Sequence, residues 1–413
     1  MINVTELSEC LCCGHDKVNL ILDLHDQPLA NSFKLNADDA EDVFPLKLNL
    51  CPNCTHLQLS HAVNPDLLFK HYLYVSGTSQ TYMKYMDWYA QWTLGQYKTH
   101  SDKTAKSVLD IGCNDGSQLD AFAKVDKQLT TLGVDPAENL FVLSTTKGHD
   151  VRCGYWNESM VADLIKHKST VDIISTQNVF AHTSYPLKFL QMCKEIMHDD
   201  SVMFVQTSQA DMVRNNEFDT IYHEHLSFFN ASSMQALASR AGLNLVEITK
   251  TPIHGNSYVF VFSKTATPSA NVKAVLQEEM DVGLQKYSTY EEYAVKCCEA
   301  ITNLKETVRN YRGDGYVIAG YGAAAKGNTL LNFGEIRLDF IIDDNPLKQD
   351  LFTPGTSIPV LSIDILKEVE DMQVVFIPLA WNLFNEIRTN IKQVRNKEGD
   401  VFVRYFPAIS IEI

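Results

Sequence analysis

The chain has 413 residues, of which 45% are hydrophobic and 21% charged, and its formal net charge is −16 at pH 7. This length predicts two to three domains, and an acidic excess with no basic stripe to offset it argues against a nucleic-acid partner. No apolar run approaches the roughly 20 residues that cross a bilayer, and the start lacks the basic and apolar parts of a signal peptide, so we expect a cytoplasmic protein with no membrane partner.

Two cysteine pairs mark the N-terminal segment. Cys10-x-x-Cys13 and Cys51-x-x-Cys54 have the spacing of metal-binding knuckles, with 37 residues between the pairs. In a reducing compartment such pairs hold a metal more often than they form disulfides, and four thiolates suit a closed, tetrahedral, structural zinc site. The long separation indicates that a small domain folds between the pairs. We predict a zinc-binding domain over residues 1–70, whose zinc takes no part in catalysis.

The central part of the chain, over residues 71–264, has the pattern of a doubly wound α/β sheet. An apolar strand over 107–111 leads into a turn and a helix that begins near Ser117. A second strand ends at Asp135, where a carboxylate can accept both hydroxyls of a ribose. Further strands are predicted in this order: 171–176, 201–207, 243–248 and 257–262. This succession matches the Rossmann-like sheet of a class I methyltransferase, closed by a final hairpin.

The turn after the first of these strands indicates which cofactor the sheet binds. Its glycines are spaced Gly112-x-x-x-Gly116, which differs from the G-x-G-x-x-G of a dinucleotide-binding turn. An acidic residue at Asp110 repels phosphate, but it suits the ammonium and sulfonium groups of S-adenosylmethionine. We therefore predict an S-adenosylmethionine site. The residues expected to bind this cofactor are Asp110, Gly112, Asn114, Asp135 and Gln177.

Residues 265–413 are predicted to form a helical linker and a second Rossmann-like α/β domain. A helix is expected over 271–312, with breaks near Ser288. A strand then leads into a glycine-rich turn over 320–325, and an acidic strand end follows at Asp343. Alone, this pattern fits a dinucleotide fingerprint and raises the alternative of a nicotinamide-dependent oxidoreductase. The helix start that follows can equally bind the diphosphate of a nucleotide-linked substrate, through Lys326 and Asn328.

One run, Tyr222-His223-Glu224-His225, concentrates titratable side chains just past the strand over 201–207. A histidine titrates near neutrality, and a neighbouring carboxylate can orient it, so the run can serve as a general acid or base. Its spacing is not the His-Glu-x-x-His of helical zinc proteases. From these four residues alone, acid–base chemistry, metal ligation and a structural role all remain open.

Six motifs occur in order and cover nearly the whole chain. They are the two cysteine pairs taken together and the segments 110–116, 178–182, 222–229, 254–257 and 320–331. Together they resemble the bacterial nucleotide-sugar C-methyltransferases, in particular the C-3 methyltransferases of deoxysugar biosynthesis. The resemblance implies a three-domain enzyme that uses S-adenosylmethionine and contains zinc. It also implies that the last domain helps to hold the nucleotide-sugar and binds no nicotinamide.

The resemblance further implies roles for single residues. The resemblance implies substrates similar to dTDP-linked 4-keto-deoxyhexoses, although the sequence does not show whether the nucleotide is dTDP, GDP or another. Their methylation needs a base at C-3 and a donor for the oxyanion at O-4. The resemblance implies His225 as the base, Tyr222 as the donor to O-4 and Glu224 as their support, and it leaves His223 a structural role. Expected substrate contacts are Tyr72, Tyr74, Asn178, His182, His254, Asn256, Lys326 and Asn328.

Structural roles stay open for some of these substrate contacts. His182 could cap the helix that follows it, Tyr72 and Tyr74 could pack at a domain joint, and Lys326 could be a solvated lysine at a helix start. For the chain as a whole, three alternatives remain: a nucleotide-sugar oxidoreductase that uses the glycine-rich turn, a sugar O-methyltransferase, and a scaffold without activity.

Overall fold

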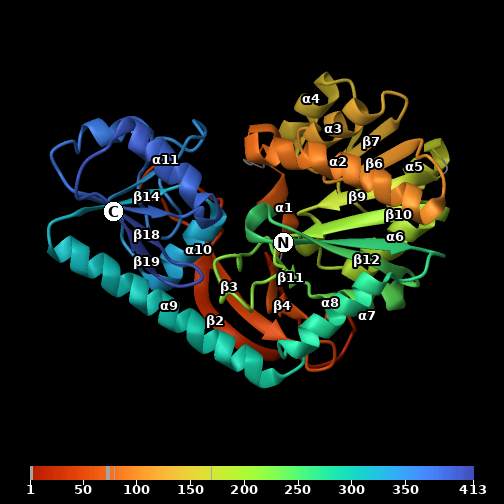
Figure 1. Cartoon of the computed structure of the whole chain (residues 1–413), viewed down its shortest axis with the longest axis horizontal. Coiled ribbons are helices and arrows are strands. Elements are labelled where there is room, and N and C mark those ends of the chain that lie inside the picture. Colours follow the sequence, from red (N-terminus) through yellow and green to blue (C-terminus); the bar gives the residue numbers. More distant parts are fainter. Residues whose placement is uncertain (1–2, 71–74, 79, 169) are drawn as a thin grey trace.

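The computed structural model describes residues 3–70, 75–78, 80–168 and 170–413, and the expected substrate contacts Tyr72 and Tyr74 lie outside these residues. The chain forms two α/β lobes, with the N-terminal strands between them at their base (Figure 1). We call them the central lobe, residues 80–264, and the C-terminal lobe, residues 287–413. Within the described ranges, no helix is both long and apolar enough to cross a bilayer.

The N-terminal strands form two small antiparallel sheets. Their apolar residues alternate with polar ones, as in β3, where the leucines at 46, 48 and 50 are buried. One sheet pairs β1 (Val4–Glu6) with β5 (His61–Val63). The other has the order β11-β4-β3-β2 and consists of β2 (Asn19–Pro28), β3 (Val43–Leu50), β4 (Leu57–Leu59) and β11 (Ser227–Phe228). The chain then passes through α1 (Pro65–Phe69) and η1 (Ser76–Thr78) to the central lobe.

The central lobe contains a seven-stranded sheet of the order β12-β13-β10-β9-β6-β7-β8. Its first five strands along the chain run parallel, and β13 lies antiparallel between β10 and β12. The predicted methyltransferase sheet with its final hairpin is therefore confirmed. The strands are β6 (Ser107–Ile111), β7 (Thr130–Asp135), β8 (Asp150–Cys153), β9 (Val171–Gln177), β10 (Met197–Thr207), β12 (Asn244–Thr251) and β13 (Ser257–Ser263).

Helices cover both faces of this sheet, and in such folds a ligand binds at the carboxyl ends of the parallel strands. The helix α2 packs its buried tyrosines against one face, and α6 and α7 contribute to the core on the other. The helical elements here are α2 (Gln80–Ser101), α3 (Ser117–Val125), α4 (Glu138–Thr146), α5 (Glu158–Lys168), η2 (Phe180–His182), α6 (Pro186–Ile196), α7 (Ala231–Ala241) and η3 (Ile253–Gly255).

The C-terminal lobe contains a six-stranded sheet of the order β16-β15-β14-β17-β18-β19, parallel except for its last strand. Its core is continuous with that of the sheet containing β2, β3 and β4. The elements that follow the central lobe along the chain are α8 (Ala270–Asp281), α9 (Tyr287–Gly313), β14 (Val317–Tyr321), α10 (Ala325–Gly334), β15 (Phe340–Ile342), β16 (Val360–Leu361), η4 (Ile363–Lys367), β17 (Val374–Pro378), η5 (Trp381–Leu383), α11 (Phe384–Val394), β18 (Val401–Arg404) and β19 (Ser410–Glu412). Helix α8 packs on the central lobe, and α9 runs along the outer side of the C-terminal lobe (Figure 1).

One strand was not predicted from the sequence, and the predicted helix break lies a few residues too late. The edge strand β8 was missed, because its four residues are only partly buried and form no apolar run. The helix expected over 271–312 is interrupted at 282–286, so Ser288 lies inside α9 instead of marking the break. Gly283 in this interruption has a φ of +78°, a left-handed conformation that favours glycine and ends α8 before Ser288.

Candidate active site and zinc centre

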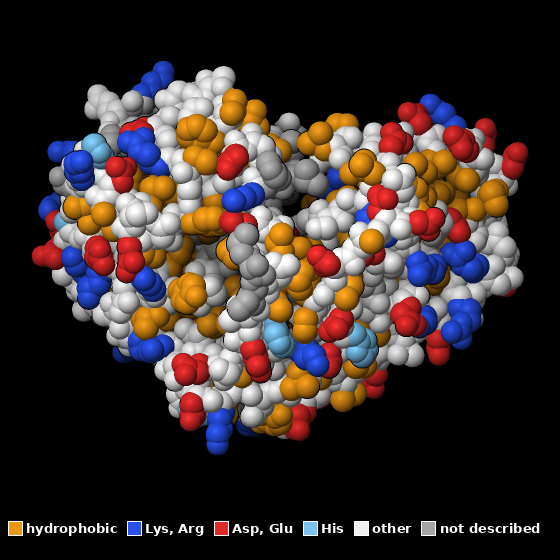
Figure 2. Space-filling model, turned by 180° about the vertical axis from the view of Figure 1, so that it is seen from behind, with side chains coloured by type: hydrophobic (Ala, Val, Ile, Leu, Met, Phe, Trp, Pro, Cys, Tyr) orange, Lys and Arg blue, Asp and Glu red, His pale blue; other side chains and the backbone are white. Residues whose placement is uncertain are grey.

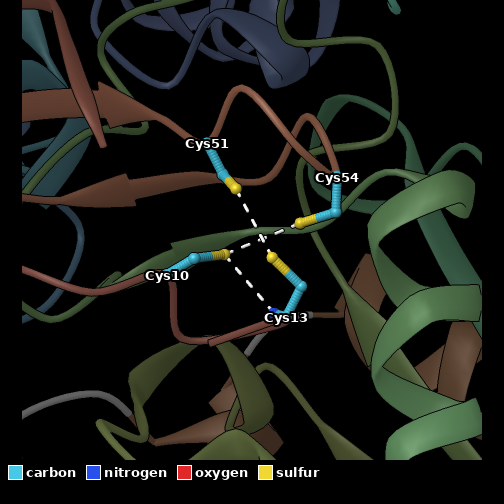
Figure 3. A group of neighbouring side chains, drawn as sticks. All are labelled: Cys10, Cys13, Cys51 and Cys54. Atoms are coloured by element: carbon cyan, nitrogen blue, oxygen red, sulfur yellow. Dashed lines mark hydrogen bonds between the residues drawn. The ribbon is translucent and has the colours of Figure 1, made fainter. Parts of the chain in front are cut away.

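The two cysteine knuckles come together at one point (Figure 3). The Sγ atoms of Cys10 and Cys54 are 3.6 Å apart and those of Cys13 and Cys51 are 3.5 Å apart, and all four lie within 4.8 Å of one another. Four sulfurs at about 2.3 Å from one zinc ion would be about 3.8 Å apart. The backbone N–H of Asn53 donates to Cys51 Sγ at 3.4 Å, as suits a thiolate. The donor set fits zinc and leaves no coordination position open.

The run from Tyr222 to His225 lies between β10 and β11, and its hydrogen bonds fix the tautomer of His225. Nδ1 of His225 lies 2.8 Å from the carbonyl oxygen of Thr220. A carbonyl oxygen can only accept, so Nδ1 carries the proton and Nε2 has a free lone pair. The hydroxyl of Tyr222 is 2.9 Å from that Nε2 and therefore donates to it. The two side chains form a hydrogen-bonded pair with a basic nitrogen at its centre.

The surroundings of His225 keep its imidazole neutral. Burial, followed by the neighbouring His182, lowers the pKa of His225 well below 6.5. The rings of His182 and His225 stack with centroids 5.2 Å apart, and the ring of Phe69 also stacks on His182, with centroids 5.2 Å apart. Burial also lowers the pKa of His182 to about 4. Helix α6 has Tyr185 at its N-cap and no side-chain cap, so His182 does not cap that helix.

The other two residues of the run bond to the N-terminal segment, one to the turn after β2 and one to β3. Asn31 donates from Nδ2 to Oε1 of Glu224 at 2.5 Å, a partner that the sequence did not indicate. His223 donates from Nε2 to the carbonyl oxygen of Phe44 at 3.2 Å, and burial lowers the pKa of His223 to about 4. Glu224 and His223 therefore tie the run to Asn31 and Phe44.

Two buried carboxylates lie at the carboxyl ends of β6 and β7. Asp135 accepts from the backbone N–H groups of Asn114 and Ala137, each at 2.8 Å, which fixes the orientation of its carboxylate. Asp110 is 3% exposed, and burial, with a further contribution from Asp135, raises its pKa to about 7. At Gly112 the φ is +79° and a Cβ would lie 2.2 Å from Cγ2 of Val179, so only glycine fits this turn.

Amide groups line the same edge at the end of β9. Gln118 donates from Nε2 to the Met86 carbonyl oxygen at 3.3 Å, so its Oε1 faces Gln177 and accepts from Gln177 Nε2 at 2.9 Å. This chain of bonds leaves Oε1 of Gln177 as a buried acceptor with no partner among the described residues. Oδ1 of Asn178 is a second such acceptor. Acceptors beside two carboxylates fit the hydroxyls and ammonium group of S-adenosylmethionine.

The remaining expected substrate contacts lie where the two lobes meet. Nζ of Lys326 lies 3.4 Å from the carbonyl oxygen of His254, and burial, followed by Lys326, lowers the pKa of His254 to about 4. Nε2 of His254 is buried without a partner in the described part of the chain. Asn256 donates to Asp211 at 3.0 Å, and Asn328 is buried and donates to the Ala30 carbonyl oxygen.

Sequence reasoning missed several buried polar residues of this region. Gln206 on β10 is 0% exposed, and neither atom of its amide has a partner among the residues described. Leaving a buried polar group unpaired costs about 1–3 kcal/mol, so a ligand or water is expected there. A lone glutamine in an apolar strand was the available signal. Gln118 and Trp381, which donates to Asp219 at 2.9 Å, carried no such signal because their partners are distant in sequence.

The space-filling view shows the molecule hollowed between its two lobes (Figure 2). On this face, lysine and arginine side chains are interspersed with aspartate and glutamate and gather into no basic stripe (Figure 2). The catalytic candidates and the cofactor edge belong to the central lobe, whereas Lys326 and Asn328 belong to α10 of the C-terminal lobe. A ligand that contacts both sets therefore has to bridge the lobes.

Three domain-family models match successive parts of the chain. A "Putative zinc binding domain" matches residues 10–69, a "Methyltransferase domain" matches 87–248, and a "C-methyltransferase C-terminal domain" matches 252–407. The glycine-rich turn over 320–325 lies within the last of these matches, which removes the support for a nicotinamide-dependent oxidoreductase. The predicted zinc-binding domain and S-adenosylmethionine-dependent methyltransferase domain are confirmed by these matches and by the cysteine cluster.

The chain is also similar to several methyltransferases, one of them over nearly its full length. The C-methyltransferase NovU of Streptomyces niveus is 29% identical over 411 residues, which cover 97% of this chain and 96% of NovU. A ubiquinone biosynthesis O-methyltransferase of Actinobacillus pleuropneumoniae serotype 7 (strain AP76) is 27% identical, but over only 25% of this chain and 45% of its own length. The plantazolicin methyltransferase BpumL in complex with SAH is 16% identical, with a TM-score of 0.37, and the match covers 45% of this chain and 86% of BpumL. The chain is an S-adenosylmethionine-dependent C-methyltransferase with a zinc-binding N-terminal domain, a central methyltransferase domain and a C-methyltransferase C-terminal domain.

Proposed function

We propose that this C-methyltransferase acts on a nucleotide-linked 4-keto-deoxyhexose and methylates its C-3 through an enolate. The observation that carries the proposal is the Tyr222–His225 pair, in which the Tyr222 hydroxyl lies 2.9 Å from an unprotonated His225 Nε2. Carbon becomes nucleophilic only after it loses a proton, and a C–H beside a ketone is acidic enough for an enzyme base to remove. The pair offers that base together with a hydroxyl donor for the ketone oxygen.

In the proposed reaction, the C-3–H bond breaks and its proton moves to Nε2 of His225, while the electron pair forms an enolate with its charge on O-4. The single hydrogen of the Tyr222 hydroxyl turns from Nε2 to O-4 as Nε2 takes the proton. Nε2 then donates to the Tyr222 oxygen, so the two side chains stay bonded. Bound S-adenosylmethionine supplies the electrophilic methyl group, which Asp110, Asp135 and Gln177 would hold in place by binding the cofactor's polar ends.

The C-terminal lobe supports a nucleotide-linked substrate. The N-terminus of α10 has no side-chain cap, and Lys326 lies in its first turn. A free helix N-terminus and a lysine together favour a diphosphate. The carboxylate of Asp343 disfavours a diphosphate on its own side of the helix start, because it is negatively charged and already accepts from the backbone N–H of Ala323 at 2.7 Å. We therefore expect the diphosphate to approach α10 from the side of Lys326 and His254, where the two lobes meet.

Hydrogen exchange at C-3 tests this function. A 4-keto sugar nucleotide is incubated with the protein in D2O without methyl donor, and loss of the C-3 proton is followed by NMR. His225→Asn keeps a donor for the Thr220 carbonyl but removes Nε2, so we expect exchange to slow by at least about 100-fold. His223→Gln is the matched control, because His223 is equally buried but bonds to Phe44. It should exchange within about threefold of the wild type.

Product analysis separates the proposal from O-methylation. A panel of dTDP- and GDP-linked 4-keto sugars is incubated with S-adenosylmethionine in D2O. The expected product carries its new methyl group on C-3, and no other ring proton is replaced by deuterium. A product methylated on oxygen, formed without C-3 exchange, would overturn the proposal in favour of a sugar O-methyltransferase. Exchange that persists unchanged in His225→Asn would overturn the role proposed for His225.

A further inference from the structure

The segment 216–221, which leads into Tyr222, forms neither a helix nor a strand, yet it is deeply buried. Phe218, Asp219 and Ile221 in it are each 0% exposed. Buried backbone groups need hydrogen-bond partners, and a segment outside regular structure has to find them elsewhere in the fold. The partners of this segment therefore determine where the Tyr222–His225 pair sits.

The N–H groups of Asn216, Glu217 and Ile221 bond within the loop itself, but several acceptors of the segment are bound by the C-terminal lobe. The hydroxyl of Tyr293 on α9 donates to the carbonyl oxygen of Glu217 at 2.8 Å. The hydroxyl of Thr329 on α10 donates to the carbonyl oxygen of Ile221 at 3.0 Å. Trp381 Nε1 donates to the Asp219 carboxylate at 2.9 Å, and Cys297 Sγ lies 3.6 Å from the carbonyl oxygen of Asn216. Three separate elements of that lobe thus hold one segment of the central lobe.

The anchored carbonyls flank the one that fixes His225. The Thr220 carbonyl accepts from Nδ1 of His225, the next carbonyl, of Ile221, accepts from Thr329, and the next residue is Tyr222 itself. Thr329 is 1% exposed, so water does not readily replace its hydroxyl. A shift of the Ile221 peptide would move the Thr220 carbonyl and the Tyr222 side chain together.

We propose that Tyr293 and Thr329 are positioning residues for the Tyr222–His225 pair, so that the C-terminal lobe completes the active site of the central lobe in addition to any contact it makes with substrate. This positioning role depends on the proposed function in one respect only, the identification of His225 as the catalytic base. It predicts that removing either hydroxyl lowers turnover while leaving the S-adenosylmethionine site, at the ends of β6, β7 and β9, intact.

Two tyrosines of α9 provide a matched pair for the first test. Tyr290 and Tyr293 are each 1% exposed, and each donates from its hydroxyl to a carbonyl oxygen at 2.8 Å. The bond of Tyr290 goes to Leu284 and does not reach the segment 216–221. Tyr293→Phe should speed amide hydrogen exchange over 216–226, measured by mass spectrometry on the full chain without substrate, whereas Tyr290→Phe should leave exchange there unchanged.

Thr329 provides the second test through a conservative rescue. Thr329→Val keeps the shape of the side chain but loses the donor, and Thr329→Ser keeps the donor. Displacement of reacting groups by about 1 Å can cost about 100-fold in rate, so we expect Thr329→Val to lower kcat by about 10- to 100-fold. The calorimetric affinity for S-adenosylmethionine should stay within about twofold, and Thr329→Ser should restore kcat to within about threefold.

Each outcome decides for or against the positioning role. Equal amide exchange in the two tyrosine variants would overturn it, as would wild-type kcat in Thr329→Val or a serine variant as slow as the valine one. A loss of S-adenosylmethionine affinity that matches the loss of kcat would indicate general unfolding and would also overturn it. If the wild type turns over no keto-sugar nucleotide, the proposed function fails, while amide exchange over 216–226 still decides the positioning role.

Discussion

We predict that the buried carboxyl of Asp110 lowers the stability of the ligand-free protein and strengthens the binding of S-adenosylmethionine. The side chain is 3% exposed at the end of β6, and burial, with a further contribution from Asp135, raises its pKa to about 7 from the ordinary 3.8. In the unfolded chain the carboxyl is water-exposed and loses its proton near pH 4. The variant Asp110→Asn replaces the group by a neutral amide of the same shape and removes its titration.

The sign and size of the effect follow from this pKa difference. Between about pH 4 and 7 the folded state holds a proton on Asp110 that the unfolded state has lost, so the free energy of unfolding falls as the pH rises through this range and levels off above it. One pKa unit corresponds to about 1.36 kcal/mol, so the fall is at most about 4 kcal/mol. Without ligand, Asp110→Asn should be more stable than the wild type at pH 8, with the difference shrinking toward pH 5.

The cofactor should reverse this preference, because its ammonium and sulfonium groups favour the ionised carboxylate. In the wild type, the affinity for S-adenosylmethionine is expected to rise with pH up to about 7 and then level off. Asp110→Asn should lose this pH dependence and bind about 10- to 100-fold more weakly at pH 8, the cost of about 1.5–3 kcal/mol for a hydrogen bond to a charged group. Urea unfolding followed by circular dichroism and titration calorimetry, both from pH 5.5 to 8.5, measure the two effects.

Asp172 provides a control of opposite sign. Burial would raise its pKa, but hydrogen bonds from the backbone N–H of Lys106 and from the side chains of His198, Ser107 and Tyr97 outweigh burial and lower it. Asp172→Asn should therefore destabilise the protein at pH 8, unlike Asp110→Asn. A stability difference between Asp110→Asn and wild type that is the same at pH 5.5 and 8.5, together with unchanged cofactor affinity, would refute the reasoning.

Three further predictions concern the pair, the cofactor edge and the zinc. Tyr222→Phe removes the donor on His225 and should lower kcat by about 10²- to 10³-fold without changing cofactor affinity; a wild-type initial rate would contradict this. Gln118→Leu frees the Gln177 amide to turn, so calorimetry should show weaker binding of S-adenosylmethionine but unchanged binding of an analogue without the amino group. Wild-type protein should contain about one zinc per chain by elemental analysis, and Cys51→Ser should lose the metal and melt earlier; a metal-free wild type that melts normally would contradict the site.

The sequence allowed the local features of the fold to be predicted. Apolar runs and turn residues located six of the seven strands of the central sheet, and the spacing within each cysteine pair is a short-range pattern that zinc geometry imposes. What could not be predicted are contacts between distant segments. Asn31 bonds to Glu224 across 193 positions, and Trp381 to Asp219 across 162. Local patterns of hydrophobicity do not encode such partners, because packing between lobes selects them.

The same limit applies to the cofactor edge. Asp110, Gly112 and Asp135 follow from their places at strand ends, whereas Gln118 shows its relation to Gln177 only once α3 and β9 lie side by side. The roles of these residues remain predictions until variants are measured. Gln206 shows how a sequence signal can be overlooked, because a polar residue in an apolar strand is easily taken for an edge position, although β10 is central in the sheet.

The pairing of β11 with β4 limits where the chain can be cut into domains that fold and function separately. Strand β11 follows the Tyr222–His225 run within two residues, and its partner follows the second cysteine knuckle; Leu59 also donates to the Leu226 carbonyl oxygen at 2.9 Å. A chain shortened to begin at residue 80 would lose the strand that borders its own active site. A chimera that joins segments from different relatives should therefore be active only when its β4 and β11 can still pair with each other. The choice of domain boundary does not remove this requirement.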